Sequence, residues 1–228
     1  MDKNYINLSR QLHKSSDSFG IASAYDNVRT LKGILQLPAA LISTAASYTI
    51  NNVLDFGTGQ GGLITSMKKE VELKNIKFVG YDPAVKAYQS KPTSSFDIVT
   101  CIDVLEHISR EDIMNILQDI NSHTNGFFFF AIDLMPAKKI LSDGRNAHIL
   151  LAPADWWTQQ ISSIFSFTRF LQVGHTVNHE KHPIHLFGWA TNDYKYQNCA
   201  NHFLDHIKIL EKKWIYKKEG GSVNFAEY

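Results

Sequence analysis

A glycine-rich turn between residues 57 and 62 constrains the fold of this chain more than any other feature. The short apolar segment 52–56 before it has the character of a buried strand, and residues 63–70 after it have helical spacing. Glycines at 57, 59 and 61 allow a sharp turn and the close approach of a ligand. The free N–H groups at the start of the following helix point toward that ligand. This strand, turn and helix are typical of an α/β unit that binds a cofactor.

The rest of the chain alternates between apolar strand segments and amphipathic helical segments. We expect strands at 76–81, 96–102 and 127–132, helices at 110–121, 154–165 and 195–213, and a hairpin formed by 167–177 and 184–190. Alternation of this kind predicts a mainly parallel sheet covered by helices on both faces, with ligands beyond the carboxyl ends of the strands. The predicted fold class is therefore α/β: a three-layer, Rossmann-like fold with a C-terminal antiparallel hairpin. Residues 1–48 are expected to form an N-terminal helical cap, with helices broken at Pro38, and residues 49–228 the main domain.

Charge and composition narrow the classes of partner and compartment. The chain has 23 basic and 22 acidic residues, so no overall field favours nucleic acid or an anionic membrane. No apolar stretch reaches the roughly 18 residues of a membrane span, and the polar N-terminus does not resemble a signal peptide. The two cysteines, Cys101 and Cys199, form no C-x-x-C pair, so neither a disulfide framework nor a Cys-rich zinc site is expected. We expect a cytoplasmic protein that binds neither nucleic acid nor membrane; its oligomeric state is left open.

Two cofactors are compatible with the glycine-rich turn. Gly57, Gly59 and Gly62 satisfy the G-x-G-x-x-G pattern, and Asp82 follows Gly62 by 20 residues, which is the fingerprint of an NAD site. Asp55, two residues before Gly57, argues for the other cofactor. Its carboxylate would repel a pyrophosphate but would suit the ammonium group of S-adenosylmethionine (SAM). An NAD(P)-dependent oxidoreductase therefore stays as the alternative.

The segment from Leu54 to Gly61 resembles the D-x-G-x-G-x-G motif of class I SAM-dependent methyltransferases. Phe96–Val99 followed by Asp103–His107 resembles the F-D-V-V…E-V-L-E-H signature of the branch that includes ubiquinone-biosynthesis O-methyltransferases. The resemblance spans about residues 50–190 and implies that SAM is the cofactor. It places four residues against the methionine and ribose side of SAM, namely Asp55, Gly57, Gly59 and Gly61. It places Asp82 on the ribose hydroxyls, and we assign Asp103 to the cofactor-binding residues as well.

The sequence departs from this family after Asp82. Only 15 positions separate Asp82 from Asp97, where the family has a helix, a third strand and an acidic residue that contacts adenine. Residues 84–95 are too few for that unit. The third strand is therefore expected to be vestigial, and no adenine-binding acid is assigned.

Methyl transfer requires the acceptor to be held in line with the methyl group and, for a hydroxyl, to lose a proton. His148 and His107 follow strands at the expected ligand edge, so we assign them with Asp103 as catalytic candidates. Packing or capping roles are the alternative for both histidines. The predicted function is methyl transfer to a small-molecule acceptor, and a SAM-binding module without turnover is another possibility.

The same residues permit a metal-assisted alternative. Asp103, Glu106, His107 and His148 resemble the E-x-x-E-H motif and later histidine with which small-RNA 2′-O-methyltransferases hold a divalent ion, here Mg²⁺ or Mn²⁺. The near-zero net charge counts against an RNA substrate. Because Glu106 and His107 also recur in branches of the fold that use no metal, we assign none.

Three further features have ordinary structural interpretations. Trp156-Trp157 are expected to start a helix packed on the core, or else to line an acceptor pocket. Arg145 is expected to bind either an anionic acceptor or a neighbouring carboxylate. Four further histidines are expected to lie in a solvated hairpin loop rather than in a zinc site: His175, His179, His182 and His185.

Overall fold

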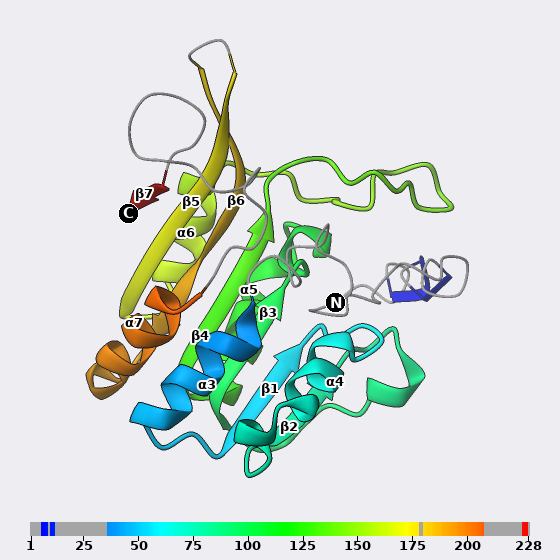
Figure 1. Ribbon diagram of the computed structural model, residues 1–228. Helices are drawn as coiled ribbons and strands as arrows, with labels where there is room; N and C mark the ends of the chain where they lie inside the picture. Colours follow the sequence, from blue (N-terminus) through cyan, green and yellow to red (C-terminus); the bar gives the residue numbers. More distant parts are fainter. Residues whose placement is uncertain (1–5, 9, 12–35, 178–179, 208–224, 228) are drawn as a thin grey trace.

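The computed structural model describes residues 6–8, 10–11, 36–177, 180–207 and 225–227, with the backbone alone described for 173–177, 180–183 and 225–227. Within these residues the strands form one seven-stranded sheet in the order β2-β1-β3-β4-β6-β5-β7 (Figure 1). The strands are β1 (Asn52–Phe56), β2 (Lys77–Tyr81), β3 (Phe96–Ile102), β4 (Thr124–Asp133), β5 (Phe167–Val177), β6 (Glu180–Thr191) and β7 (Phe225–Glu227). The helices are α3 (Leu37–Ser47), α4 (Gly62–Lys69), α5 (Ile113–His123), α6 (Ala154–Ser162) and α7 (Gln197–Asp205). Short 3₁₀ helices are η1 (Val71–Leu73), η2 (Lys86–Tyr88), η3 (Leu105–His107) and η4 (Tyr194–Tyr196).

The sheet has a parallel half and an antiparallel half. β2, β1, β3 and β4 are parallel neighbours, so the loops after all four strands leave from one edge of the sheet. β6 pairs antiparallel with β4 and with β5, and β5 pairs antiparallel with β7. The predicted fold class, with its C-terminal antiparallel hairpin, is confirmed.

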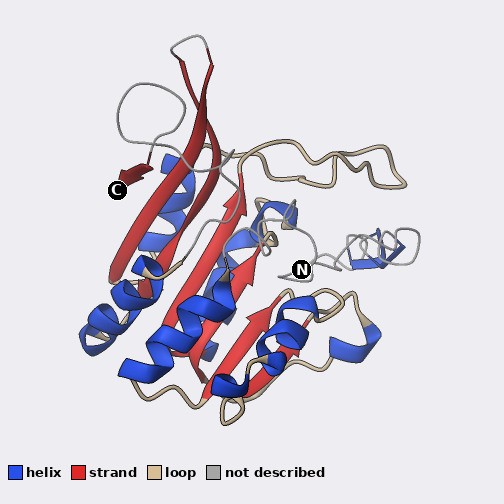
Figure 2. Ribbon diagram, viewed as in Figure 1, coloured by secondary structure: helices blue, strands red, loops and turns tan. Residues whose placement is uncertain are grey.

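Helices cover both faces of the sheet (Figure 2). α3, α4 and α7 pack on one face, in a cluster that includes Phe127 and Phe129. α5 and α6 pack on the other face, in a cluster that includes Phe128 and Phe130. Successive strand side chains point to opposite faces, so β4 contributes aromatic rings to both clusters.

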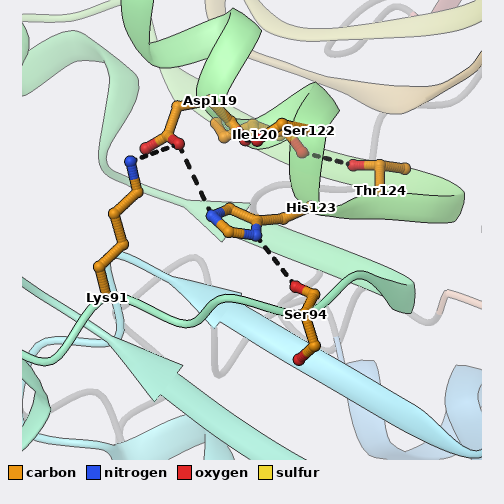
Figure 3. A network of polar contacts seen from close by, with 7 residues as sticks. All are labelled: Lys91, Ser94, Asp119, Ile120, Ser122, His123 and Thr124. Atoms are coloured by element: carbon orange, nitrogen blue, oxygen red, sulfur yellow. Dashed lines mark hydrogen bonds and ion pairs between the residues drawn. The ribbon is translucent and has the colours of Figure 1, made fainter.

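The described chain has no strand between β2 and β3, as predicted from its short spacing. The segment that replaces it is attached to α5 by polar contacts (Figure 3). Lys91 Nζ lies 2.6 Å from Asp119 Oδ1, and His123 Nδ1 donates to the Ser94 carbonyl oxygen at 3.0 Å. These contacts hold the segment after β2 close to the parallel half of the sheet.

Pro38 lies in the first turn of α3, at the position where the sequence predicts a break between two helices. The first turn tolerates proline because its N–H groups have no partners inside the helix. Leu31, Ile34 and Leu35 lie outside the described residues, and the domain division at residue 48 stays a prediction. No described helix combines the length and apolar character of a membrane span.

The histidine-rich segment differs from its prediction. β6 begins at Glu180, so residues expected in a loop continue the hairpin strands. His185 lies in β6, is buried, and pairs across the sheet with Asp133 at the end of β4. The strand predicted at 184–190 is therefore confirmed at His185, whereas the prediction that His185 is solvated is wrong, because β6 pairs with β4 and the residue is buried. His179 lies outside the described residues.

Candidate active site

The glycine-rich turn after β1 is closed by hydrogen bonds to the end of β2. The N–H groups of Gly57 and Thr58 donate to the Tyr81 carbonyl oxygen at 2.7 and 3.1 Å. Gly57 and Gly61 have φ angles of 79° and 78°, in the left-handed region that glycine tolerates best. Space is limited as well, because a Cβ added at Gly57 would lie 2.3 Å from a Val104 methyl group.

Asp82 connects the turn after β1 to the loop after β2. Its Oδ2 accepts a hydrogen bond from the Gly59 N–H at 3.0 Å, and its Oδ1 accepts one from the Ala84 N–H at 2.9 Å. The side chain is buried, so these bonds fix the relative position of the two loops. Each oxygen keeps a second lone pair for a further donor. The predicted contact of Asp82 with the ribose is compatible with this geometry and stays a prediction.

Asp55 carries a buried carboxylate at the end of β1. The residue is 2% exposed, and its Oδ1 accepts a hydrogen bond from the Thr100 hydroxyl at 2.9 Å. Oδ2 of Asp55 and the hydroxyl oxygen of Thr58 are both buried without a hydrogen-bond partner in the described chain. Leaving a buried polar group unsatisfied costs about 1–3 kcal/mol. A ligand that donates to these two oxygens would remove that cost.

An open cleft of about 550 Å³ lies beside this turn, next to the loop after β2. Its lining residues are Arg10, Gln60, Ala84, Val85, Lys86, Ala87 and Gln89. The volume lies within the range of small-molecule and cofactor sites. The Tyr88 hydroxyl also lies against the turn, because a Cβ added at Gly61 would be 2.1 Å from it.

The loop after β3 places acidic and imidazole groups beside the turn. Asp103 has a φ angle of 55°, which is uncommon for a residue with a side chain, and its N–H donates to the Ala131 carbonyl oxygen at 3.0 Å. Val104 contacts the glycine-rich turn, and η3 follows it directly. Asp103 and His107 therefore leave the sheet at the same edge as Asp55.

Glu106 is fully buried beneath this loop. Its Oε1 accepts a hydrogen bond from the Asp133 N–H at 3.2 Å, while Oε2 has no hydrogen-bond partner in the described chain. Burial, and next the nearby Asp103 carboxylate, raise the pKa of Glu106 well above its ordinary value. Glu106 is thus a buried acid with one free oxygen between the ends of β3 and β4.

The long loop between β4 and α6 brings His148 to the same place. Asn146 organises this loop, because its Oδ1 accepts hydrogen bonds from the N–H groups of Ala137 and His148, both at 2.9 Å. The His148 ring then lies edge-on to the His107 ring, with centroids 4.9 Å apart. The two predicted catalytic histidines, 41 residues apart in sequence, are therefore neighbours.

Backbone carbonyl groups fix the orientation of both imidazoles. His107 Nδ1 lies 2.7 Å from the Ala147 carbonyl oxygen, and His148 Nδ1 lies 2.5 Å from the Met135 carbonyl oxygen. A carbonyl only accepts, so each Nδ1 carries the proton and Nε2 has the lone pair in the neutral ring. In each ring, Nε2 is thus the atom that can act as a base or as a metal ligand.

Other predicted candidates do not join this cluster. Arg145 lies 2.7 Å from the Asp143 carboxylate and is exposed, which matches the alternative of pairing with a neighbouring carboxylate. Trp157 is fully buried in the core, as expected for the start of a packed helix. Trp156 is half-buried, with the Arg110 guanidinium 4.6 Å from its ring centroid.

Two residues of the site are absent from the predicted set: Thr100, which donates to Asp55, and Tyr88, whose hydroxyl lies against the turn. Thr100 had a local signal, because it is a hydroxyl residue inside an otherwise apolar strand. Tyr88 had none, because its position depends on how the segment after β2 folds.

Comparisons with known proteins agree with this architecture. The sequence profile of the methyltransferase domain family matches residues 24–182, more than half of the chain. The plantazolicin methyltransferase BamL, in complex with a triazolic desmethylPZN analog and SAH, has a similar structure, with a TM-score of 0.52 and 12% identity over 82% of this chain and 91% of that one. The plantazolicin methyltransferase BpumL, in complex with a monoazolic analog and SAH, gives a TM-score of 0.52 and 13% identity over 83% of this chain and 97% of that one. No curated protein matches the chain.

Proposed function

Because the chain belongs to the methyltransferase domain family, its cofactor is S-adenosylmethionine, and we propose that it methylates a small-molecule acceptor held between the Asp55 turn and the His107–His148 pair. Bound SAM supplies an electrophilic methyl group on a sulfonium. The chain itself must orient cofactor and acceptor, exclude water and manage the acceptor proton.

The observation that carries this proposal is the unpartnered Oδ2 of Asp55. Asp55 is buried, and Thr100 already donates to its other oxygen, so Oδ2 faces a position that a donor must fill. The ammonium group of SAM is such a donor. The hydroxyl of Thr58 offers a second buried contact in the same turn. NAD would instead place its anionic pyrophosphate at the glycine-rich turn, where the Asp55 carboxylate would repel it.

The histidine pair His107 and His148 favours an acceptor that is methylated on a hydroxyl oxygen. His107 and His148 are neighbours with Nδ1 held by a carbonyl oxygen, and the Nε2 of a neutral imidazole can remove a hydroxyl proton. The resemblance of residues 96–107 to the ubiquinone-biosynthesis branch points to the same chemistry. The net charge of +1 favours a small acceptor over RNA.

Isothermal titration calorimetry with SAH and with NAD tests the cofactor assignment. The wild-type chain should bind SAH and not NAD, and Asp55→Asn should weaken SAH binding at least tenfold, about 1.4 kcal/mol. The matched control is Asp143→Asn, which changes an exposed carboxylate on the loop after β4. Binding of NAD without SAH would refute the proposal. Turnover of labelled SAM with small hydroxylated acceptors then separates an enzyme from a SAM-binding module.

A further inference from the structure

We propose that Glu106, His107 and His148 form a binding site for one divalent transition-metal ion. These residues each offer one ligand atom, and the three atoms all lie within 4.8 Å of one another. Ligands bound at about 2.1 Å to a common ion lie roughly 3 to 3.5 Å apart. Side-chain shifts of about 1 Å would therefore bring all three into the coordination range of one ion.

Both histidines are already oriented as ligands. Their Nδ1 atoms are held by the carbonyl oxygens of Ala147 and Met135, so the lone pair of each neutral ring lies on Nε2. A second hydrogen bond of this kind is the usual support of a metal-bound imidazole, because it fixes the tautomer and the ring orientation. Two neighbouring rings with this support are suited to sharing one ion.

Glu106 provides an independent indication of a ligand. The residue is 0% exposed, and its Oε2 has no hydrogen-bond partner in the described chain. Its other oxygen accepts the Asp133 N–H, so the carboxylate cannot turn away without leaving that donor unsatisfied. A buried carboxylate is stable when it pairs with a cation or coordinates a metal.

The ligand set selects the class of ion. Two imidazoles and one carboxylate suit Mn²⁺, Fe²⁺, Co²⁺ or Zn²⁺, whereas Mg²⁺ and Ca²⁺ prefer oxygen ligands alone. Three protein ligands leave coordination positions open. An acceptor hydroxyl bound at such a position would lose its proton to bulk water more readily. Only this consequence, and not the metal site itself, rests on the proposed methyl transfer. His107 and His148 would then be ligands instead of bases.

Titration of the chelator-treated, dialysed full chain with MnCl₂ tests the site directly. We expect one Mn²⁺ per chain in calorimetry, and a visible absorption band when CoCl₂ is used instead. Glu106→Gln and His148→Ala should each weaken Mn²⁺ binding at least tenfold. The control His123→Ala should bind as wild type, because His123 lies on α5 and contacts Asp119 and Ser94.

Two results would overturn the inference: no saturable Mn²⁺ or Co²⁺ binding by the wild type, or binding that both site variants retain unchanged. Circular dichroism confirms that each variant is folded, and Glu106→Gln keeps the side-chain volume should His148→Ala fail to fold. SAH calorimetry on the same samples separates the two proposals. SAH binding without Mn²⁺ binding removes only the metal site, and Mn²⁺ binding without SAH binding removes only the proposed function.

Discussion

Thr100 on β3 donates a 2.9 Å hydrogen bond to Oδ1 of Asp55 on β1, which leaves Oδ2 as the oxygen without a partner. Both residues are buried, so this bond determines which way the carboxylate faces. A strand neighbour thus sets the orientation of a residue at the cofactor turn.

We expect Thr100→Val to weaken SAH binding, because the Asp55 carboxylate loses the donor that orients it. The free energy of unfolding should also fall, by about 1–3 kcal/mol, since a buried acceptor is left unsatisfied. Thr191→Val is the matched control, because the buried Thr191 hydroxyl donates to the Gly126 carbonyl oxygen in another part of the sheet. It should reduce stability and leave SAH affinity unchanged in calorimetry. Equal SAH affinities for Thr100→Val and the wild type would contradict the orienting role.

Asp82→Ala should weaken SAM binding at least tenfold, about 1.4 kcal/mol. The Gly59 and Ala84 N–H groups would lose their acceptor, so the two loops would no longer be held together. The melting temperature should fall for the same reason. Asp82→Asn keeps the volume and one acceptor, and should lie between the wild type and the alanine variant. An unchanged affinity in calorimetry would show that neither the loop contact nor the predicted ribose contact matters.

Gly57→Ala and Gly144→Ala form a matched pair that separates backbone strain from steric conflict. Both glycines have positive φ, 79° and 86°. A Cβ at position 57 would meet Val104 at 2.3 Å, whereas at position 144 it meets nothing within 4 Å. Gly144→Ala should cost only the backbone strain, about 1 kcal/mol. Gly57→Ala should lower the melting temperature more than Gly144→Ala does. It should also weaken SAH binding, whereas Gly144→Ala should leave SAH affinity unchanged.

His148→Ala should lower kcat by about 10²–10⁴ and leave SAM affinity nearly unchanged, whether His148 acts as base or as ligand. Chelation separates these roles, since EDTA abolishes wild-type turnover and Mn²⁺ restores it only if His148 is a ligand. If His148 is a base, EDTA should leave wild-type turnover unchanged. A kcat within about threefold of wild type, or ~0.65 kcal/mol, would exclude both roles. A lowered melting temperature would then assign it to packing.

The native protein should resist thiol reagents. Burial raises the pKa of the Cys199 thiol to about 11, and Cys101 is also buried. At pH 8 only about one Cys199 in a thousand is then a thiolate, the form that reacts. Incubation with a maleimide followed by mass spectrometry should show no adduct on the folded chain and two on the guanidinium-unfolded chain. Rapid single labelling of the folded chain would contradict this burial.

Local patterns were sufficient to predict the parallel half of the sheet. The strand at Asn52–Phe56, its glycine turn and the vestigial unit after Asp82 are all encoded within a few residues, through apolar periodicity, glycine spacing and length. The start of β6 at Glu180 could not be predicted, because residues 180–183 have no apolar pattern and belong to the strand only through their pairing with β5.

The site was predictable only as a set of separate candidates. Glu106 and His107 are adjacent in sequence, but the approach of His148 depends on a loop whose path is fixed by Asn146. The hydrogen bonds that the two histidines donate to the Ala147 and Met135 carbonyl oxygens, which fix the tautomers, have no sequence signature. Chemistry that depends on tautomer and distance therefore required the folded chain.

The four consecutive phenylalanines of β4 leave the alignment of that strand undefined by its own interior. A slip by one residue would exchange the rings between the two faces and put another phenylalanine at three of the four positions, so the usual mismatch penalty for a slip is small here. The register must instead be fixed near the start of the strand. There, a Cβ added at Gly126 would lie 2.0 Å from the Asp97 carbonyl oxygen, and the Thr191 hydroxyl donates a hydrogen bond to the Gly126 carbonyl oxygen. The register of β4 is thus set at Gly126 and not by the phenylalanine run. Substitutions within the run should preserve the register, whereas a larger residue at Gly126 should shift the strand and displace the groups that follow it, including His148.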